Sequence, residues 1–140
     1  KLPKLKTYYP YTQIKGRLIS TRVVGVTFEN RQEVVARLQM GDRVWLEMEP
    51  DNRYDPNAIK VSRENGEQFG YINRRLAADI VHYFRAYGYP VHGKVSLLTG
   101  SEWNGYSLGV VIAFKLPKPK RSKNNGHNPS FENWDDDWEF

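Results

Sequence analysis

The residue types best suited to chemistry or binding are gathered in one short segment, Pro50–Val61, with the sequence PDNRYDPNAIKV. It places a guanidinium, an aromatic ring and carboxylates within six residues. An aromatic face can stack on a nucleic-acid base, a guanidinium can bind phosphate, and a carboxylate accepts a hydrogen bond from a hydroxyl. Turn formation also explains this composition, because Pro, Asp and Asn are common turn residues, and Asp55 can cap the turn Asp55–Asn57 through the local backbone.

Catalytic motifs are missing from the sequence. It contains no GxxxxGK[ST], GxSxG or HExxH pattern, and its three histidines are scattered. Within Pro50–Val61, Asp51 and Asp55 have no third acidic partner, so this loop is only weak support for a magnesium-dependent nuclease. The absence of cysteine excludes disulfides, thiolate nucleophiles and Cys-ligated zinc. We therefore expect a non-catalytic binding module with no metal and no other cofactor.

The charge distribution favours a polyanionic partner. The 140 residues carry a formal net charge of +5, and residues 115–140 contain five basic and five acidic side chains. The whole excess therefore lies in residues 1–114, as it would in a nucleic-acid-binding body. The longest apolar run, Val110–Phe114, is far shorter than the about 20 residues of a membrane helix, so we expect a cytoplasmic protein without a membrane partner. Because the chain begins with Lys1 rather than Met, we treat it as a candidate piece of a longer protein.

Hydrophobic periodicity predicts a mainly β domain with two helices, an α+β fold of the small OB-like or SH3-like curved β-barrel kind. The expected strands are 15–28, 43–49, 58–63, 68–72, 91–99 and 106–114, with bends at Gly16 and Gly25. A first helix is expected at 31–39, where Asn30 and Glu33 could form a capping box. A second helix is expected to begin after Asn73 and end at Gly88. Asn65-Gly66 predicts a hairpin turn.

The chain divides by composition into four parts. Residues 1–14 form a basic N-terminal arm, 15–114 the barrel, 115–130 a disordered linker rich in Pro, Lys and Asn, and 131–140 an acidic and aromatic tail. The tail is expected to bind a protein partner through Trp134, Asp135, Asp136, Asp137, Trp138 and Phe140, and it resembles the acidic tips of single-stranded-DNA-binding proteins. A solubilising tail is the simpler alternative.

Further candidates for nucleic-acid binding lie at the edges of the expected strands and helices. Tyr54, Tyr71 and Tyr106 stand at strand edges, where a ring can present its face to a base. Arg53 and Arg74 stand where they can reach phosphates. Asn73 and the two arginines after it form a helix N-terminus, which favours anions.

Two motifs resemble the HIRAN domain, a module that also occurs alone in bacteria and phages. They are the E-P-x-N-x-Y-D-x-N-A-I-x-V run at Glu49–Val61 and the G-x-x-x-G-Y-I-x-R-x-L-A run at Gly66–Ala77. The resemblance covers about residues 23–114 and does not extend to either tail.

The resemblance implies a modified OB-like barrel that captures the 3′ end of single-stranded DNA. By position, Asp55 would accept a hydrogen bond from the terminal 3′-hydroxyl, and Tyr54 would stack on a terminal base. Tyr106 matches a stacking phenylalanine of the family. Asn52 matches an asparagine of the pocket, and Arg74 matches a lysine that faces the phosphates.

The sequence departs from the family pattern at several of these positions. Thr27 and Phe28 stand where an Arg-Tyr pair is found, which keeps a ring and removes a cation. Tyr71 replaces a histidine, and Asp51 replaces an asparagine. Arg53 stands where proline is usual and is expected to restore the lost cation.

Two other functions remain open on the sequence alone. In one, the chain is a protein-interaction adaptor whose acidic Trp/Phe tail recruits a partner while the barrel is a scaffold. In the other, it is an accessory subunit of a DNA-processing helicase or nuclease, in DNA repair or replication, with the catalytic domain elsewhere.

Overall fold

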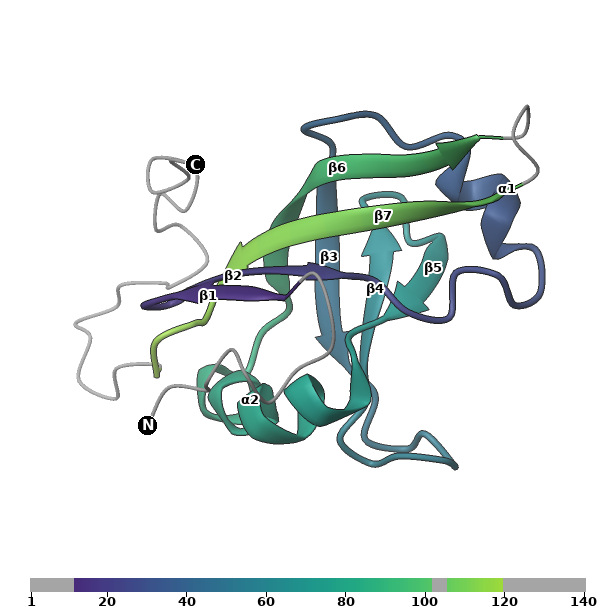
Figure 1. Ribbon diagram of the computed structural model, residues 1–140. Coiled ribbons are helices and arrows are strands. Elements are labelled where there is room, and N and C mark those ends of the chain that lie inside the picture. The colour runs from purple at the N-terminus through teal and green to yellow at the C-terminus, as the bar shows by residue number, and fades with distance from the viewer. Residues whose placement is uncertain (1–11, 102–105, 120–140) are drawn as a thin grey trace.

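A single curled β-sheet forms the body of the protein. The computed structural model describes residues 12–101 and 106–119 (Figure 1). Seven antiparallel strands pair in the order β1-β2-β7-β6-β3-β4-β5. The strands are β1 Gln13–Lys15, β2 Leu18–Arg22, β3 Arg43–Met48, β4 Ile59–Arg63, β5 Gln68–Tyr71, β6 Val91–Ser101 and β7 Tyr106–Lys115; the helices are α1 Arg31–Val35 and α2 Arg74–Tyr87. The predicted OB-like curved barrel, mainly β with two helices, is confirmed.

The segment after β2 brings the two halves of the curled sheet together. Val23 N donates to Val110 O on β7, whereas Val24 exchanges two backbone hydrogen bonds of 2.9 Å with Tyr71 on β5. This approach is close, since a Cβ on Gly70 would lie 2.6 Å from the Val24 carbonyl oxygen. Gly70 therefore permits the contact through which the far ends of the sheet meet.

Helix α2 packs its apolar face under the sheet (Figure 1). The Asn73 side chain accepts hydrogen bonds from the backbone N–H groups of Arg75 and Leu76, and the helix ends at Gly88 with φ 83°. Both predicted caps of this helix are confirmed. The buried residues of the helix are Leu76, Ala77, Ile80, Val81, Phe84 and Tyr87, and the Phe84 ring meets Phe114 of β7 edge to face at 6.3 Å. The helix thus fixes the β5–α2 junction, which lines the site described below.

Two sequence-based expectations were wrong in detail. The strand expected at 15–28 is broken: Gly16, at φ 61°, turns the chain between β1 and β2, and β2 ends at Arg22. The first helix is a five-residue turn rather than 31–39, and the Asn30 side chain makes no capping hydrogen bond. Backbone bonding replaces the expected capping box, because Glu33 N donates to Asn30 O.

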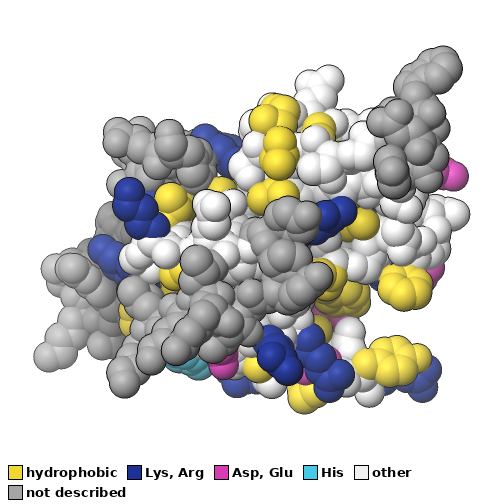
Figure 2. Space-filling model, viewed as in Figure 1, with side chains coloured by type: hydrophobic (Ala, Val, Ile, Leu, Met, Phe, Trp, Pro, Cys, Tyr) yellow, Lys and Arg dark blue, Asp and Glu magenta, His cyan; other side chains and the backbone are white. Residues whose placement is uncertain are grey.

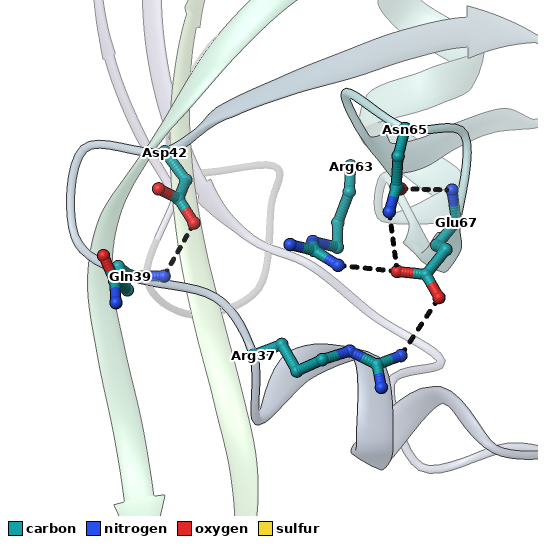
Figure 3. Close-up of polar contacts among 6 residues, drawn as sticks. All are labelled: Arg37, Gln39, Asp42, Arg63, Asn65 and Glu67. Atoms are coloured by element: carbon teal, nitrogen blue, oxygen red, sulfur yellow. Dashed lines mark hydrogen bonds and ion pairs between the residues drawn. The ribbon is translucent and has the colours of Figure 1, made fainter.

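A cluster of polar side chains holds the β4–β5 hairpin against the segment that follows α1 (Figure 3). Glu67 accepts from Arg63 at 2.6 Å, from Arg37 at 3.0 Å and from Asn65 at 3.0 Å. Hydrogen bonds from Asn65 and Arg63, together with the arginine charges, lower the pKa of Glu67. The predicted Asn-Gly turn is present here, with Gly66 at φ 95°. No helix within 12–101 and 106–119 is long and apolar enough to cross a membrane.

Candidate functional site

An open pocket of about 920 Å³ lies where three connections meet. These are the segment between β2 and α1, the β3–β4 loop, and the junction of β5 with α2. The surface is notched there, on the right of the view in Figure 2, with hydrophobic side chains above and below the notch. Seven residues predicted from the sequence line this pocket: Phe28, Asn52, Arg53, Tyr54, Asp55, Tyr71 and Arg74.

Two other predicted residues differ from that group. Thr27 is exposed beside Phe28 but does not line the pocket. Tyr106 begins β7, opposite Ser101, and its side chain lies outside the described part of the structure. The predicted tail at 131–140, including Trp134, Trp138 and Phe140, also lies outside the described residues.

Asn52 organises the β3–β4 loop from within. Its side-chain oxygen accepts from the backbone N–H groups of Tyr54 at 2.8 Å and Asp55 at 2.9 Å. Its side-chain nitrogen donates to Glu49 Oε1 at 2.6 Å. These bonds use both ends of the amide, so Asn52 is a positioning residue that sets the direction of Tyr54 and Asp55.

Asp55 uses one carboxylate oxygen to cap the turn and directs the other toward Arg74. Its Oδ1 accepts from Asn57 N at 2.9 Å, which is the turn cap expected from the sequence. Its Oδ2 lies 3.7 Å from Arg74 Nε, and the side chain is only 17% exposed. Arg85 donates to the Asn57 side chain and so ties this turn to α2. Asp55 is therefore held rigidly, with one oxygen directed toward the pocket cation Arg74.

Glu49 and Tyr71 form the hydrogen-bonded floor of the pocket. The Tyr71 hydroxyl donates to Glu49 Oε1 at 2.7 Å. Burial alone would raise the pKa of Glu49, but hydrogen bonds from Asn52 and Tyr71 and the charges of Lys60 and Arg31 outweigh it and lower the pKa. Burial and the bond to Glu49 raise the pKa of the Tyr71 hydroxyl. The floor thus carries an ionised carboxylate and a neutral phenol at neutral pH.

Arg31 covers the Tyr71 ring from the side of α1. Its guanidinium carbon lies 5.4 Å from the ring centroid, which is a cation–π distance, and its side chain is 15% exposed. It donates to Gly25 O at 2.9 Å and pairs with Glu29 at 3.2 Å. Gly25 has φ 74°, and a Cβ there would lie 3.1 Å from the Arg31 guanidinium. The glycine bend expected at this position therefore makes room for the arginine.

Two aromatic rings stand in solvent at the pocket. Tyr54 is 80% exposed and Phe28 is 65% exposed, although both are large apolar side chains. Exposed rings beside a pocket are typical of a stacking surface rather than of a core. Arg53 is also exposed, and it makes no hydrogen bond or ion pair with any residue that the structure describes.

The charges that line the pocket are nearly balanced. Three guanidiniums (Arg31, Arg53 and Arg74) face four carboxylates (Glu29, Glu49, Asp51 and Asp55). The helix N–H groups of Arg75 and Leu76 are already bonded to Asn73, so α2 offers little additional attraction for an anion here. Among residues 12–101 and 106–119, no group of three or more His, Cys, Asp or Glu could hold a metal ion. The site therefore suits a planar group with hydroxyls better than a run of phosphates.

Glu49 and Arg31 are two pocket residues with clear contacts that sequence reasoning did not select as binding residues. Glu49 belongs to the first family motif, and that membership was the available signal. No sequence signal pointed to Arg31, because its contact with Tyr71 joins residues that are distant in the sequence. Both contribute through contacts that only the folded sheet creates.

The protein is a small OB-like barrel, and its pocket combines exposed rings, guanidiniums and carboxylates. This combination is typical of a ligand-binding module. The chain belongs to the HIRAN domain family: residues 17–115 match the family model described as HIRAN domain.

Relatives support this assignment. The chain is 39% identical over 105 residues to the helicase-like transcription factor of Oryctolagus cuniculus, a match that covers 74% of this chain and 8% of that protein. It is 30% identical over 108 residues to the helicase-like transcription factor of Homo sapiens, covering 76% of this chain and 8% of that protein. The matched part is thus a small fraction of these relatives.

Solved structures share the fold. The crystal structure of the HIRAN domain of human HLTF matches with a TM-score of 0.52 and 24% identity, over 71% of this chain and 76% of that one. A crystal structure of a protein from Lactobacillus plantarum matches with a TM-score of 0.53 and 24% identity, over 69% of this chain and 91% of that one. The curled sheet with its helix is therefore common to this chain, to the HIRAN domain of human HLTF and to a bacterial protein.

Proposed function

We propose that this chain is a non-catalytic module that binds single-stranded DNA at a free 3′ end. The observation that carries the proposal is the convergence of Tyr54, Phe28, Asp55 and Arg74 on one pocket of a HIRAN domain. The family resemblance implies capture of a 3′ end, and the pocket contains the groups that such capture requires.

Stacking supplies the affinity in this proposal. Tyr54 and Phe28 are exposed rings, and base–aromatic stacking contributes about 1–3 kcal/mol per base with little sequence preference. Arg53, which is exposed, and Arg74, which is 79% exposed, contact phosphates of the last nucleotides. Arg53 thereby supplies a pocket cation in place of the arginine that the family has at the position of Thr27.

Asp55 supplies the preference for an end. An ionised carboxylate accepts well from a hydroxyl and repels a phosphate, so its outward oxygen favours a terminal 3′-hydroxyl over an internal phosphodiester. The balance of four carboxylates and three guanidiniums in the pocket lining acts in the same direction. The terminal nucleoside therefore enters the pocket while the charged backbone stays at its rim.

The test is fluorescence anisotropy with one labelled strand in two forms, with a free 3′-hydroxyl or with a 3′-phosphate. Tighter binding of the hydroxyl form is expected, and the same strand annealed to its complement up to the 3′ end should bind more weakly. Equal affinity for both forms would exclude end recognition. A strand blocked only at its 5′ end is the matched control and should bind as the unblocked strand does.

A further inference from the structure

A second, smaller hollow lies on the outer face of the sheet, across β3 and β4. Its volume is about 390 Å³, within the range of about 300–1,000 Å³ that is usual for small ligand sites. Val44 and Leu46 are fully buried in the core, so Trp45 between them faces outward. Register places Trp45 opposite His92 of β6 on one side and Ser62 of β4 on the other. We call this site the Trp45 hollow; it shares no lining residue with the pocket described above.

The Trp45 ring is held in place from β6. Its centroid lies 3.7 Å from that of the His92 ring. Burial and the charge of Arg43 lower the pKa of His92, so the imidazole is neutral at neutral pH and adds no positive charge. Pro90, an exposed residue just before β6, completes this wall of the hollow. The hollow therefore has a fixed, uncharged aromatic wall.

Ser62 supplies a polar group without a partner at the hollow. The residue is only 6% exposed, and its hydroxyl makes no hydrogen bond with any residue that the structure describes. A hydroxyl removed from water without a hydrogen-bond partner costs free energy, and buried polar groups without partners are uncommon. Because Ser62 lines the hollow, a donor group of a ligand placed there would satisfy this hydroxyl.

The charges of the hollow favour a cation. Its lining contains two carboxylates, Glu47 and Glu64, and one ammonium group, Lys60. The Glu47 side chain is 50% exposed and lies 3.8 Å from Lys60, and the Glu64 side chain is 56% exposed and lies 4.0 Å from Arg43. The lining is thus negative although the whole chain carries +5. A phosphate would be repelled by this excess, whereas a cationic group would be attracted.

Arginine matches these groups better than lysine does. Its planar guanidinium can stack on an indole face and carries five N–H donors, enough for a hydroxyl and two carboxylates at once. A lysine ammonium is compact, strongly hydrated and has three donors. Protein is the natural source of such a side chain, and in the two helicase-like transcription factors compared above the matching segment is only 8% of a much longer protein.

We propose that the Trp45 hollow binds an arginine side chain from a basic segment of a partner protein. The guanidinium stacks on Trp45, donates to the Ser62 hydroxyl and pairs with Glu47 and Glu64. This site goes beyond the proposed binding of DNA and does not depend on it. The module would then hold a DNA end in one pocket and a protein partner on another face of the same sheet.

The test is a titration of the isotope-labelled full chain with three peptides, followed through the Trp45 indole N–H in NMR spectra. The peptides are acetyl-Gly-Arg-Gly-amide and its lysine and citrulline counterparts; citrulline has the shape of arginine without the charge. The spectrum of Trp45→Phe assigns the Trp45 signal, and the other three tryptophans of the chain serve as internal references. The arginine peptide should move the Trp45 signal at the lowest concentration, the lysine peptide at a higher one, and the citrulline peptide least.

Two variants test the polar groups separately. Glu47→Gln/Glu64→Gln should weaken binding of the arginine peptide about five-fold, as expected for the loss of two exposed ion pairs of ordinary strength. Ser62→Ala removes only a hydroxyl and should weaken binding about three-fold. The matched control is Glu33→Gln/Asp79→Asn, which removes two carboxylates at exposed positions outside both lining sets and should bind as the wild type does.

The outcomes separate this proposal from its alternatives. Equal binding of the arginine and citrulline peptides, or equal loss in E47Q/E64Q and the control, overturns the cation site. Thymidine 5′-monophosphate that moves the Trp45 signal at lower concentration than the arginine peptide overturns it in favour of a base-stacking site. A Trp45 signal that shifts with protein concentration alone overturns the partner in favour of a second copy of the chain. E47Q/E64Q should keep the wild-type preference for a free 3′-hydroxyl; if the wild type has no such preference, only end recognition fails.

Discussion

The Tyr71 hydroxyl donates a hydrogen bond of 2.7 Å to Glu49 Oε1 and so connects the end of β5 to the residue that follows β3. Asn52 Nδ2 donates to the same oxygen at 2.6 Å, and Asn52 in turn holds the backbone of Tyr54 and Asp55. The β3–β4 loop is therefore oriented from the floor of the pocket. Tyr71 acts through this chain of bonds, with its ring covered by Arg31.

Removing the Tyr71 hydroxyl should loosen the loop. Tyr71→Phe keeps the ring under Arg31 and deletes one bond to an ionised carboxylate, so we expect the free energy of unfolding to fall by about 1–2 kcal/mol. Affinity for single-stranded DNA should fall several-fold, because Tyr54 and Asp55 are less well oriented. Urea denaturation and anisotropy measure the two effects. Tyr89→Phe, a change outside the pocket lining, is the control for binding and should leave affinity unchanged.

Glu49 should make stability depend on pH in the acid range. Its pKa in the folded state lies below the ordinary value of 4.5, so the folded state binds this proton less tightly than the unfolded state does. The resulting stabilisation is fully present above pH 4.5 and is lost as the pH falls through the lower folded-state pKa. Glu67 also has a lowered pKa, so wild type alone does not isolate the effect.

A comparison with Glu49→Gln isolates this contribution. The difference in free energy of unfolding between wild type and E49Q should be largest at neutral pH and should shrink on acidification below about 4.5. Denaturation series at several pH values measure it. A difference that stays constant from neutral to acid pH would contradict an ionised Glu49 in the floor.

Local signals in the sequence predicted the elements that local interactions determine. Helix α2 begins after Asn73 and ends at Gly88 because an N-cap oxygen and a left-handed glycine act within one turn of a helix. The Asn65-Gly66 turn is equally local, because Gly66 takes the positive φ that the hairpin needs. The loop at Pro50–Val61 was found because its candidate binding residues are adjacent in the sequence. Its internal turn bonds, such as Asp55 to Asn57, are equally local.

Features that depend on distant residues were not predictable in the same way. Arg31 reaches the Tyr71 ring only because Val24 pairs with Tyr71 across the closing sheet. The Asn30 cap failed because Asn30 has φ −98° and ψ 23° instead of the extended backbone angles that an N-cap residue usually has. The alternating strand-like pattern at 15–28 concealed a turn at Gly16, since a β-pattern continues on either side of a tight turn.

The exposed rings should carry binding energy without carrying stability. Tyr54→Ala and Phe28→Ala should each weaken single-strand binding by about 1–3 kcal/mol, the range for loss of one stacked base. Because Tyr54 is 80% and Phe28 65% exposed, the free energy of unfolding should change little. Met40→Ala is a matched control, since Met40 is an apolar side chain 60% exposed outside the pocket lining. Equal binding by all three variants would exclude stacking at this pocket.

Asp55 allows the turn role and the hydroxyl role to be separated. In Asp55→Asn the side-chain oxygen can still accept from Asn57 N at the position of Oδ1, so the turn should survive. The Oδ2 position, 3.7 Å from Arg74 Nε, becomes a donor group that cannot accept from a 3′-hydroxyl. We therefore expect D55N to fold, to retain binding to 3′-phosphorylated strands, and to lose the preference for a free 3′-hydroxyl.

Asp55→Ala should also destabilise the turn, and anisotropy with both strand forms alongside thermal unfolding distinguishes the two variants. If D55N keeps the wild-type preference, Asp55 serves only the turn, and the end must be recognised by another group of the pocket.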